Sequence, residues 1–198
     1  MTKPRLLCDV DGPVADLTEG FKRWLNTQYP FIPEVKLFTH ENCTNFHYSK
    51  CEPLAPLQAK IDLDRELELF LGTDEAYEKF VPLTPDAFEA LDRLRNVVDV
   101  VFVTATLEGA YESYVSKRRW LKRRFPDFPV ISCPTGLKQI VGRRGDFAVD
   151  DRLETCERWY DAGVEAYVFK CPWSGLPGRL SGWTWGEIVE DFDGYTRK

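Results

Sequence analysis

The chain has 198 residues and a formal net charge of −6, and 43% of its residues are hydrophobic and 14% aromatic. These totals predict one globular domain with a modest insertion, and no apolar run approaches the ~20 residues that a membrane-spanning helix needs. The negative charge argues against a nucleic-acid polymer as the main partner, because phosphate backbones bind basic surfaces.

The first 80 residues predict a strand, a helix and an irregular segment. Residues 5–10 form a short apolar strand, and residues 15–29 carry apolar side chains at helical spacing and end before Pro30. Residues 30–80 are rich in Pro, Asn, Cys and aromatic residues, and a helix is expected there only around residues 57–71. We interpret this segment as an inserted cap.

Strands and helices alternate from residue 85 onward. Residues 97–104 are a nearly continuous β-branched run, which is typical of a strand buried on both faces. The other strands are expected at residues 129–132, 146–149 and 164–169, and the helices at 85–95, after 104 up to about 125, at 153–162 and at 185–192. The alternation predicts an α/β fold with a doubly wound parallel sheet, with residues 1–29 and 81–198 as the core and residues 30–80 as the cap.

Two further expectations come from the cysteines and the N-terminus. The N-terminus lacks the pattern of a signal peptide, which predicts a cytoplasmic protein. In that compartment cysteines are best explained as small buried hydrophobic residues and not as a disulfide framework. The six cysteines are Cys8, Cys43, Cys51, Cys133, Cys156 and Cys171.

The strongest functional signal is the pair of carboxylates at the end of the first strand. Asp9 and Asp11 follow an apolar run, and Gly12 and Pro13 then force a turn. Residues two apart on a strand share a face, where two carboxylates repel unless a divalent cation lies between them. Hard oxygen ligands suit Mg²⁺. An acidic surface turn is the alternative, but the position after a buried strand favours metal-assisted phosphoryl transfer.

Polar residues also follow three later strands. These are Thr104 to Thr106, Lys138 in the next loop, and Asp150 with Asp151. Each has an ordinary structural explanation as a capping threonine, a surface lysine or an acidic helix start. In a parallel sheet, however, all of these positions fall on the same edge as Asp9. Their coincidence favours a single site.

One basic stretch lies within the acidic chain. Residues 117–124 carry six cations in eight positions. We interpret them as the solvated face of a helix that buries Trp120 and Leu121, with steering of phosphate groups as the lesser alternative.

These segments resemble the four motifs of the haloacid dehalogenase (HAD) superfamily of phosphohydrolases, whose fold is of the Rossmannoid kind. Within it, residues 6–16 with Gly20 and Phe21 are similar to the 5′(3′)-deoxyribonucleotidases. Residues 117–120 and 149–152 resemble that family's helix after the second motif and its fourth motif, and residues 172–188 its C-terminal segment. The resemblance covers most of the core.

The resemblance implies a role for the residues of the first and fourth motifs. Asp9 would be the nucleophile that forms an aspartyl-phosphate, and Asp11 would protonate the leaving alcohol and then activate water. Mg²⁺ would be held by Asp9, by the backbone carbonyl of Asp11, by Asp151 directly and by Asp150 through water.

The resemblance also implies a phosphate-binding set and exposes three departures. Thr104 and the amide of Ala105 would bind phosphate oxygens, and Lys138 would balance the negative charge. Ala105 stands where the family usually has serine, and Leu17 where it commonly has a phenylalanine that stacks on the base. Pro13 lacks the backbone N–H of the residue usual there.

Two groups of residues in the cap have open interpretations. Five aromatic residues could stack on a base or form the cap's own small core: Phe38, Phe46, Tyr48, Phe70 and Tyr77. Four potential zinc ligands share one helical spacing, although the intervening residues make a poor helix: His40, Cys43, His47 and Cys51.

Together, the motifs and the resemblance predict a Mg²⁺-dependent phosphomonoesterase that acts on a nucleoside monophosphate, a 5′(3′)-deoxyribonucleotide. The alternatives are a phosphatase of another small phosphate ester, a polynucleotide 3′-phosphatase, and a binding protein without activity. The expected partner is a small phosphorylated substrate, with no membrane, and a homodimer is left open.

Overall fold

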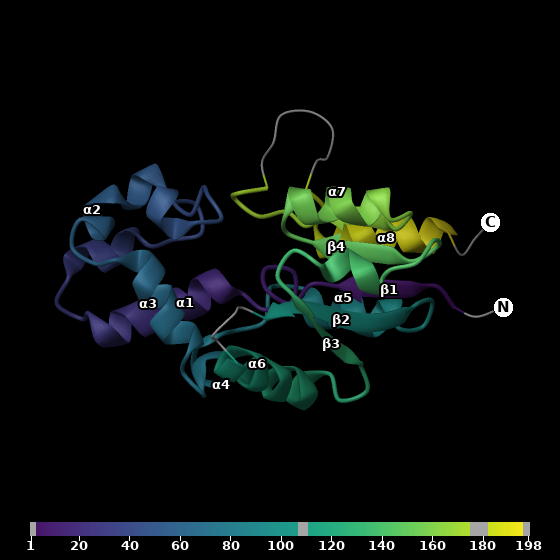
Figure 1. Ribbon diagram of the computed structural model, residues 1–198, viewed down its shortest axis with the longest axis horizontal. Helices are drawn as coiled ribbons and strands as arrows, with labels where there is room; N and C mark the ends of the chain where they lie inside the picture. Colours follow the sequence, from purple (N-terminus) through teal and green to yellow (C-terminus); the bar gives the residue numbers. More distant parts are fainter. Residues whose placement is uncertain (1–2, 107–110, 175–181, 196–198) are drawn as a thin grey trace.

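The computed structural model describes residues 3–106, 111–174 and 182–195, which contain a five-stranded parallel sheet in the order β3-β2-β1-β4-β5 (Figure 1). The register places Leu6 of β1 beside Val100 of β2 and Phe147 of β4. The strands are β1 Arg5–Cys8, β2 Asp99–Thr106, β3 Val130–Pro134, β4 Phe147–Asp150 and β5 Glu165–Val168. The doubly wound α/β fold expected from the sequence is confirmed.

Alternate residues of β1 enter two different hydrophobic clusters, as side chains on opposite faces of a strand must. Leu6 and Cys8 belong to the larger cluster, whereas Leu7 packs with Trp159 in the smaller one. This is why the strand sequence is apolar throughout, since both faces of the sheet are covered.

Helices supply the rest of both clusters. Those of the core are α1 Leu17–Gln28, α5 Ala87–Leu94, α6 Tyr111–Arg124, α7 Leu153–Asp161 and α8 Trp185–Tyr195. Side chains of α5, α6 and α8 join the larger cluster, and Trp159 of α7 joins the smaller one. All six cysteines are buried and unpaired, as the sequence predicts. In the part of the chain that is described, no helix has the length and apolar character to cross a membrane.

The segment between α1 and α5 differs from the expectation in two details. The single helix expected around residues 57–71 is two helices, α2 Ala55–Gln58 and α3 Leu63–Leu71. The break arises because Asp62 caps α3, its carboxylate accepting the amide of Arg65 at 3.2 Å. The helix α4 Ala76–Phe80 was not expected, and it packs against α1 and α6.

Figure 1 shows α2 and α3 to one side of the sheet, with α1 reaching toward them. Phe21 of α1 packs against Phe38, Tyr48 and Phe70, with ring centroids 5.3–5.6 Å away. These three aromatic residues are therefore core residues, but the core is not the segment's own, because they belong to the larger cluster that also contains Leu6 and Cys8 of β1. The segment also contains three short 3₁₀ helices, Pro33–Leu37, Tyr48–Lys50 and Glu52–Leu54. We retain the division into core and cap as a proposal.

Candidate active site

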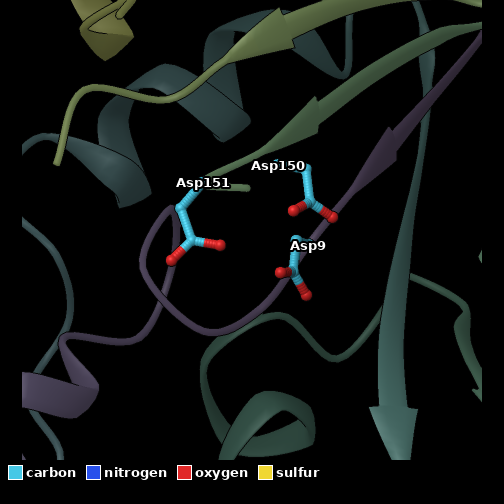
Figure 2. Close-up of side chains that lie close together, drawn as sticks. All are labelled: Asp9, Asp150 and Asp151. Atoms are coloured by element: carbon cyan, nitrogen blue, oxygen red, sulfur yellow. The ribbon is translucent and has the colours of Figure 1, made fainter. Parts of the chain in front are cut away.

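Three aspartates meet at the carboxyl ends of β1 and β4. Figure 2 shows the side chains of Asp9, Asp150 and Asp151 close together, and one oxygen of each lies within 4.8 Å of the others. Asp9 is placed there because its amide donates to the carbonyl of Val149 at 2.8 Å and thereby continues the pairing of β1 with β4. All three side chains are buried.

Lys138 supplies the positive charge in this cluster. Its Nζ lies 2.6 Å from Asp9 Oδ2 and 2.8 Å from Asp150 Oδ2. Burial alone would lower the pKa of Lys138, but Asp150 and Asp9 outweigh it and raise that pKa. Lys138 therefore stays charged and balances one of the carboxylates.

The remaining negative charge fits a divalent cation. Burial, with Asp150 and Asp11 nearby, raises the pKa of Asp9 to about 7 despite the opposing effect of Lys138. Burial together with Asp150 and Asp9 also raises the pKa of Asp151 well above its usual range. Three carboxylates against one ammonium leave an excess of negative charge, and their hard oxygen atoms are ligands that Mg²⁺ prefers.

The two aspartates of the fourth motif have different partners. Asp150 accepts hydrogen bonds on both oxygens, from Lys138 and from the amide of Arg152 at 3.0 Å. Asp151 accepts one from Trp173 Nε1 at 3.1 Å, on Oδ2. Asp151 thus keeps more lone-pair capacity for a cation, and its role as the direct ligand stays a prediction.

Asp11 stands apart from the three-aspartate group and has its own two donors. Tyr77 donates its hydroxyl to Oδ1 at 2.5 Å, and Lys117 donates to Oδ2 at 2.6 Å. The Asp11 side chain is 31% exposed and lines the cleft. Asp11 is thus held by two donors and is open to the cleft, where a carboxyl group can exchange a proton with a bound ligand.

Of the three expected phosphate-binding residues, two line the cleft and one does not. Ala105 and Lys138 line the cleft. Thr104 lies behind it, only 1% exposed, and its hydroxyl accepts a hydrogen bond from Lys117 at 2.8 Å. Lys117 therefore joins Thr104 to Asp11.

Two residues of this site were missed from the sequence. Lys117 is 3% exposed, so its assignment to a solvated face was wrong. The signal was present, because Lys117 lies one turn from Ser113 and Trp120, which are both buried on the same helix. Tyr77 was considered only as a stacking or core aromatic residue, and the helix α4 that carries it was not predicted.

The cleft has a volume of about 970 Å³ and lies between the strand ends and the cap. Leu17, Phe46, Leu67 and Leu71 give part of its wall an apolar character. The guanidinium of Arg152 stacks on the ring of Phe46 at 4.2 Å and so links the fourth motif to the opposite wall.

The four potential zinc ligands do not come together. In the part of the chain that the structure describes, the three aspartates are the only group of side chains arranged to hold a metal ion, so the zinc alternative is wrong. His40 instead bonds to Asp16 at 2.9 Å, which raises the pKa of His40. Cys51 donates its Sγ to the carbonyl of Asn45 at 3.4 Å.

Solved structures share this fold. An L-2-haloacid dehalogenase covers 96% of this chain with 99% of its own, at a TM-score of 0.56 and 9% identity. YfnB from Bacillus subtilis, described as a HAD-hydrolase, covers 98% of this chain with 100% of its own, at a TM-score of 0.56 and 16% identity. The architecture is therefore that of the haloacid dehalogenase class.

The family follows from the sequence match within that class. Residues 3–172 match the sequence model of the 5′ nucleotidase, deoxy (pyrimidine), cytosolic type C family, and the chain belongs to this family. A curated relative, the mitochondrial 5′(3′)-deoxyribonucleotidase of Mus musculus, is 29% identical over 151 residues. That match covers 75% of this chain and 64% of the relative, so the chain spans less than two thirds of the relative's length. The resemblance stated from the motifs is confirmed.

Proposed function

We propose that the protein is a Mg²⁺-dependent phosphomonoesterase that hydrolyses a nucleoside monophosphate, with a 5′(3′)-deoxyribonucleotide as its substrate. One observation carries the proposal: Asp9 lies in the cleft against Lys138 and beside two further carboxylates. Family membership and the deoxyribonucleotidase name of the mouse relative support the choice of substrate.

Asp9 has the position of a nucleophile. Its Oδ1 accepts the amide of Val10 at 2.7 Å and its Oδ2 accepts Lys138, so the carboxylate has a fixed orientation. Attack by one of its oxygens on phosphorus forms an aspartyl-phosphate while the bond from phosphorus to the ester oxygen breaks. Bound Mg²⁺, held by Asp9 and Asp151, would offset the repulsion between the carboxylate and the phosphate.

Asp11 transfers a proton in each half of the proposed reaction. In the first half of the reaction it gives a proton to the departing alkoxide, which leaves as the alcohol. In the second half it takes a proton from water, whose oxygen attacks phosphorus and releases inorganic phosphate and the free Asp9 carboxylate. Lys138 and Ala105 line the cleft, and the Lys138 ammonium and the Ala105 amide would balance and orient the charge of the phosphate oxygens.

Three rival functions are tested together with this one. Ala105 and Leu17 depart from the family's usual residues, so another small phosphate ester is the main rival. A polynucleotide 3′-phosphatase or a binding protein without activity would also use this cleft. The cytoplasmic location and the homodimer stay predictions from the sequence.

The test is turnover of the purified chain with Mg²⁺ on a panel of nucleoside monophosphates, sugar phosphates and 3′-phosphorylated oligonucleotides. We expect phosphate release that is fastest with a deoxyribonucleoside monophosphate, is stopped by EDTA, and falls by at least ~10³-fold in Asp9→Asn. If another ester is hydrolysed faster, that ester replaces the deoxyribonucleotide as the substrate. No turnover on any compound, or full turnover by Asp9→Asn, would overturn the proposal.

A further inference from the structure

Tyr77 reaches the catalytic edge from outside the sheet. It lies on α4, in the segment that we assign to the cap, and it is 0% exposed. Its amide donates to Ser116 Oγ at 3.2 Å, and its ring packs edge-on against Trp120, with centroids 6.3 Å apart. Because α6 holds both the backbone and the ring, the direction of the Tyr77 hydroxyl is fixed.

The Tyr77 hydroxyl forms its hydrogen bond with the carboxylate of Asp11. It donates to Oδ1 at 2.5 Å, while Lys117 occupies Oδ2 at 2.6 Å. One donor leaves a carboxylate free to pivot about that contact, whereas donors on both oxygens fix its plane. We propose that Tyr77 is a positioning residue, which orients Asp11 for proton transfer to the leaving alcohol. The inference rests on the proposed function.

A packing role and a positioning role make different predictions. Packing needs only the ring, which phenylalanine supplies, while positioning needs the hydroxyl. Loss of positioning should slow the first step, release of the leaving group, only where that group needs a proton, whereas the second step uses Asp11 with every ester. An alkyl ester such as a nucleoside monophosphate needs that proton, whereas p-nitrophenyl phosphate releases a stable nitrophenolate without it.

The experiment compares Tyr77→Phe with wild type, with Mg²⁺ present, on p-nitrophenyl phosphate and on the fastest alkyl ester of the substrate panel. Tyr167→Phe is the matched control, because Tyr167 also donates its hydroxyl to an aspartate, Asp191, at 2.6 Å. Tyr167 and Asp191 both lie outside the lining of the cleft. Thermal unfolding of both variants checks that each is folded.

We expect Tyr77→Phe to lower the single-turnover rate of leaving-group release from the alkyl ester by about tenfold, and that from p-nitrophenyl phosphate by less than about twofold. Tyr167→Phe should leave both rates unchanged. In an Asp11→Asn background, Tyr77→Phe should have no further effect on the alkyl ester, because the two residues act as one unit.

Equal loss on both esters, no loss on either, or an undiminished effect in the Asp11→Asn background would overturn the inference and leave the proposed function standing. A wild type that hydrolyses neither ester would overturn the proposed function itself, and the inference with it. Should Tyr77→Phe not fold, Tyr77→Gln keeps a donor in place. If Tyr77→Gln keeps its turnover of the alkyl ester, the positioning role is supported. If it loses turnover of both esters equally, the positioning role is contradicted.

Discussion

Lys117 places one charge between two side chains of the site. It contacts Asp11 and Thr104, and both of these partners lie at strand ends. A buried ammonium needs polar partners, and Asp11 and Thr104 supply them. We therefore expect Lys117 to assist the proposed reaction, although it comes from a helix rather than from a strand end.

Replacing that lysine tests its role directly. Lys117→Met keeps the length of the side chain and removes the charge, and we expect kcat on a nucleoside monophosphate to fall by about 10²-fold. The matched control is Lys122→Met on the same helix, where Lys122 donates to the carbonyl of Pro126 at 2.8 Å, away from the cleft. Activity of Lys117→Met equal to that of Lys122→Met would rule out a functional role.

Residues at strand ends could be predicted from the sequence, and those on helices could not. Asp9, Asp150 and Lys138 adjoin strands whose shared edge follows from parallel pairing, so local patterns suffice for them. Lys117 and Tyr77 reach the same edge only through the rotation of α6 and the presence of α4. Those two features depend on packing between distant segments, which a local pattern does not encode.

Among the elements, α1 and the chain after α4 lie unusually close together. A Cβ atom built on Gly20 would lie 2.5 Å from Val81 Cγ2 and 3.0 Å from its Cα. Only a residue without a side chain allows this approach. The contact holds the first turn of α1, which follows the first motif, against Val81, which follows α4.

Gly20→Ala should therefore destabilise the protein even though alanine favours helices. Overpacking should cost about 1–3 kcal/mol and helix propensity return ~1 kcal/mol, so we expect Gly20→Ala to be less stable than a glycine-to-alanine change without overpacking by about 1–3 kcal/mol. Gly194→Ala in α8 is the control, since nothing lies within 4 Å of its Cβ position. Urea unfolding of the two variants measures the difference, and a Gly20→Ala variant as stable as Gly194→Ala would contradict the packing argument.

The elements of the core follow the predicted order closely, and the cap does not. Strands and helices after residue 85 lie within a few residues of their expected bounds, because each carries an apolar period of its own, except that the helix expected directly after residue 104 begins at Tyr111, and residues 107–110 of that expectation lie outside the described residues. In the cap, α4 is five residues long and its buried residues, Ala76 and Tyr77, are adjacent rather than periodic. Such a short helix is specified by its contacts with α1 and α6.

At the scale of the whole molecule, the carboxylate cluster makes stability depend on pH. In the unfolded chain Asp9 ionises near ~4, whereas burial raises the pKa of Asp9 in the folded protein to about 7. Between these values the folded protein binds more protons than the unfolded chain. The contribution of Asp9 to stability is therefore lost as the pH rises through this window.

Metal-free protein in EDTA should consequently have a lower thermal midpoint at about pH 8 than at about pH 5. Mg²⁺ binds the ionised carboxylates, so its stabilising effect should grow over the same range. Differential scanning calorimetry at each pH measures both effects, with Asp9→Asn as the control that loses part of the slope. A midpoint in EDTA that rises with pH would contradict the assignment of this cluster.

The strand order has a consequence for the way the chain is made. β1 lies in the middle of the sheet, between β2 and β4, and Leu6 pairs with Phe147. During synthesis from the N-terminus, β1 therefore has one edge whose backbone groups stay unpaired until β4 has left the ribosome. Asp9 gains its companion carboxylates, Asp150 and Asp151, only at that point.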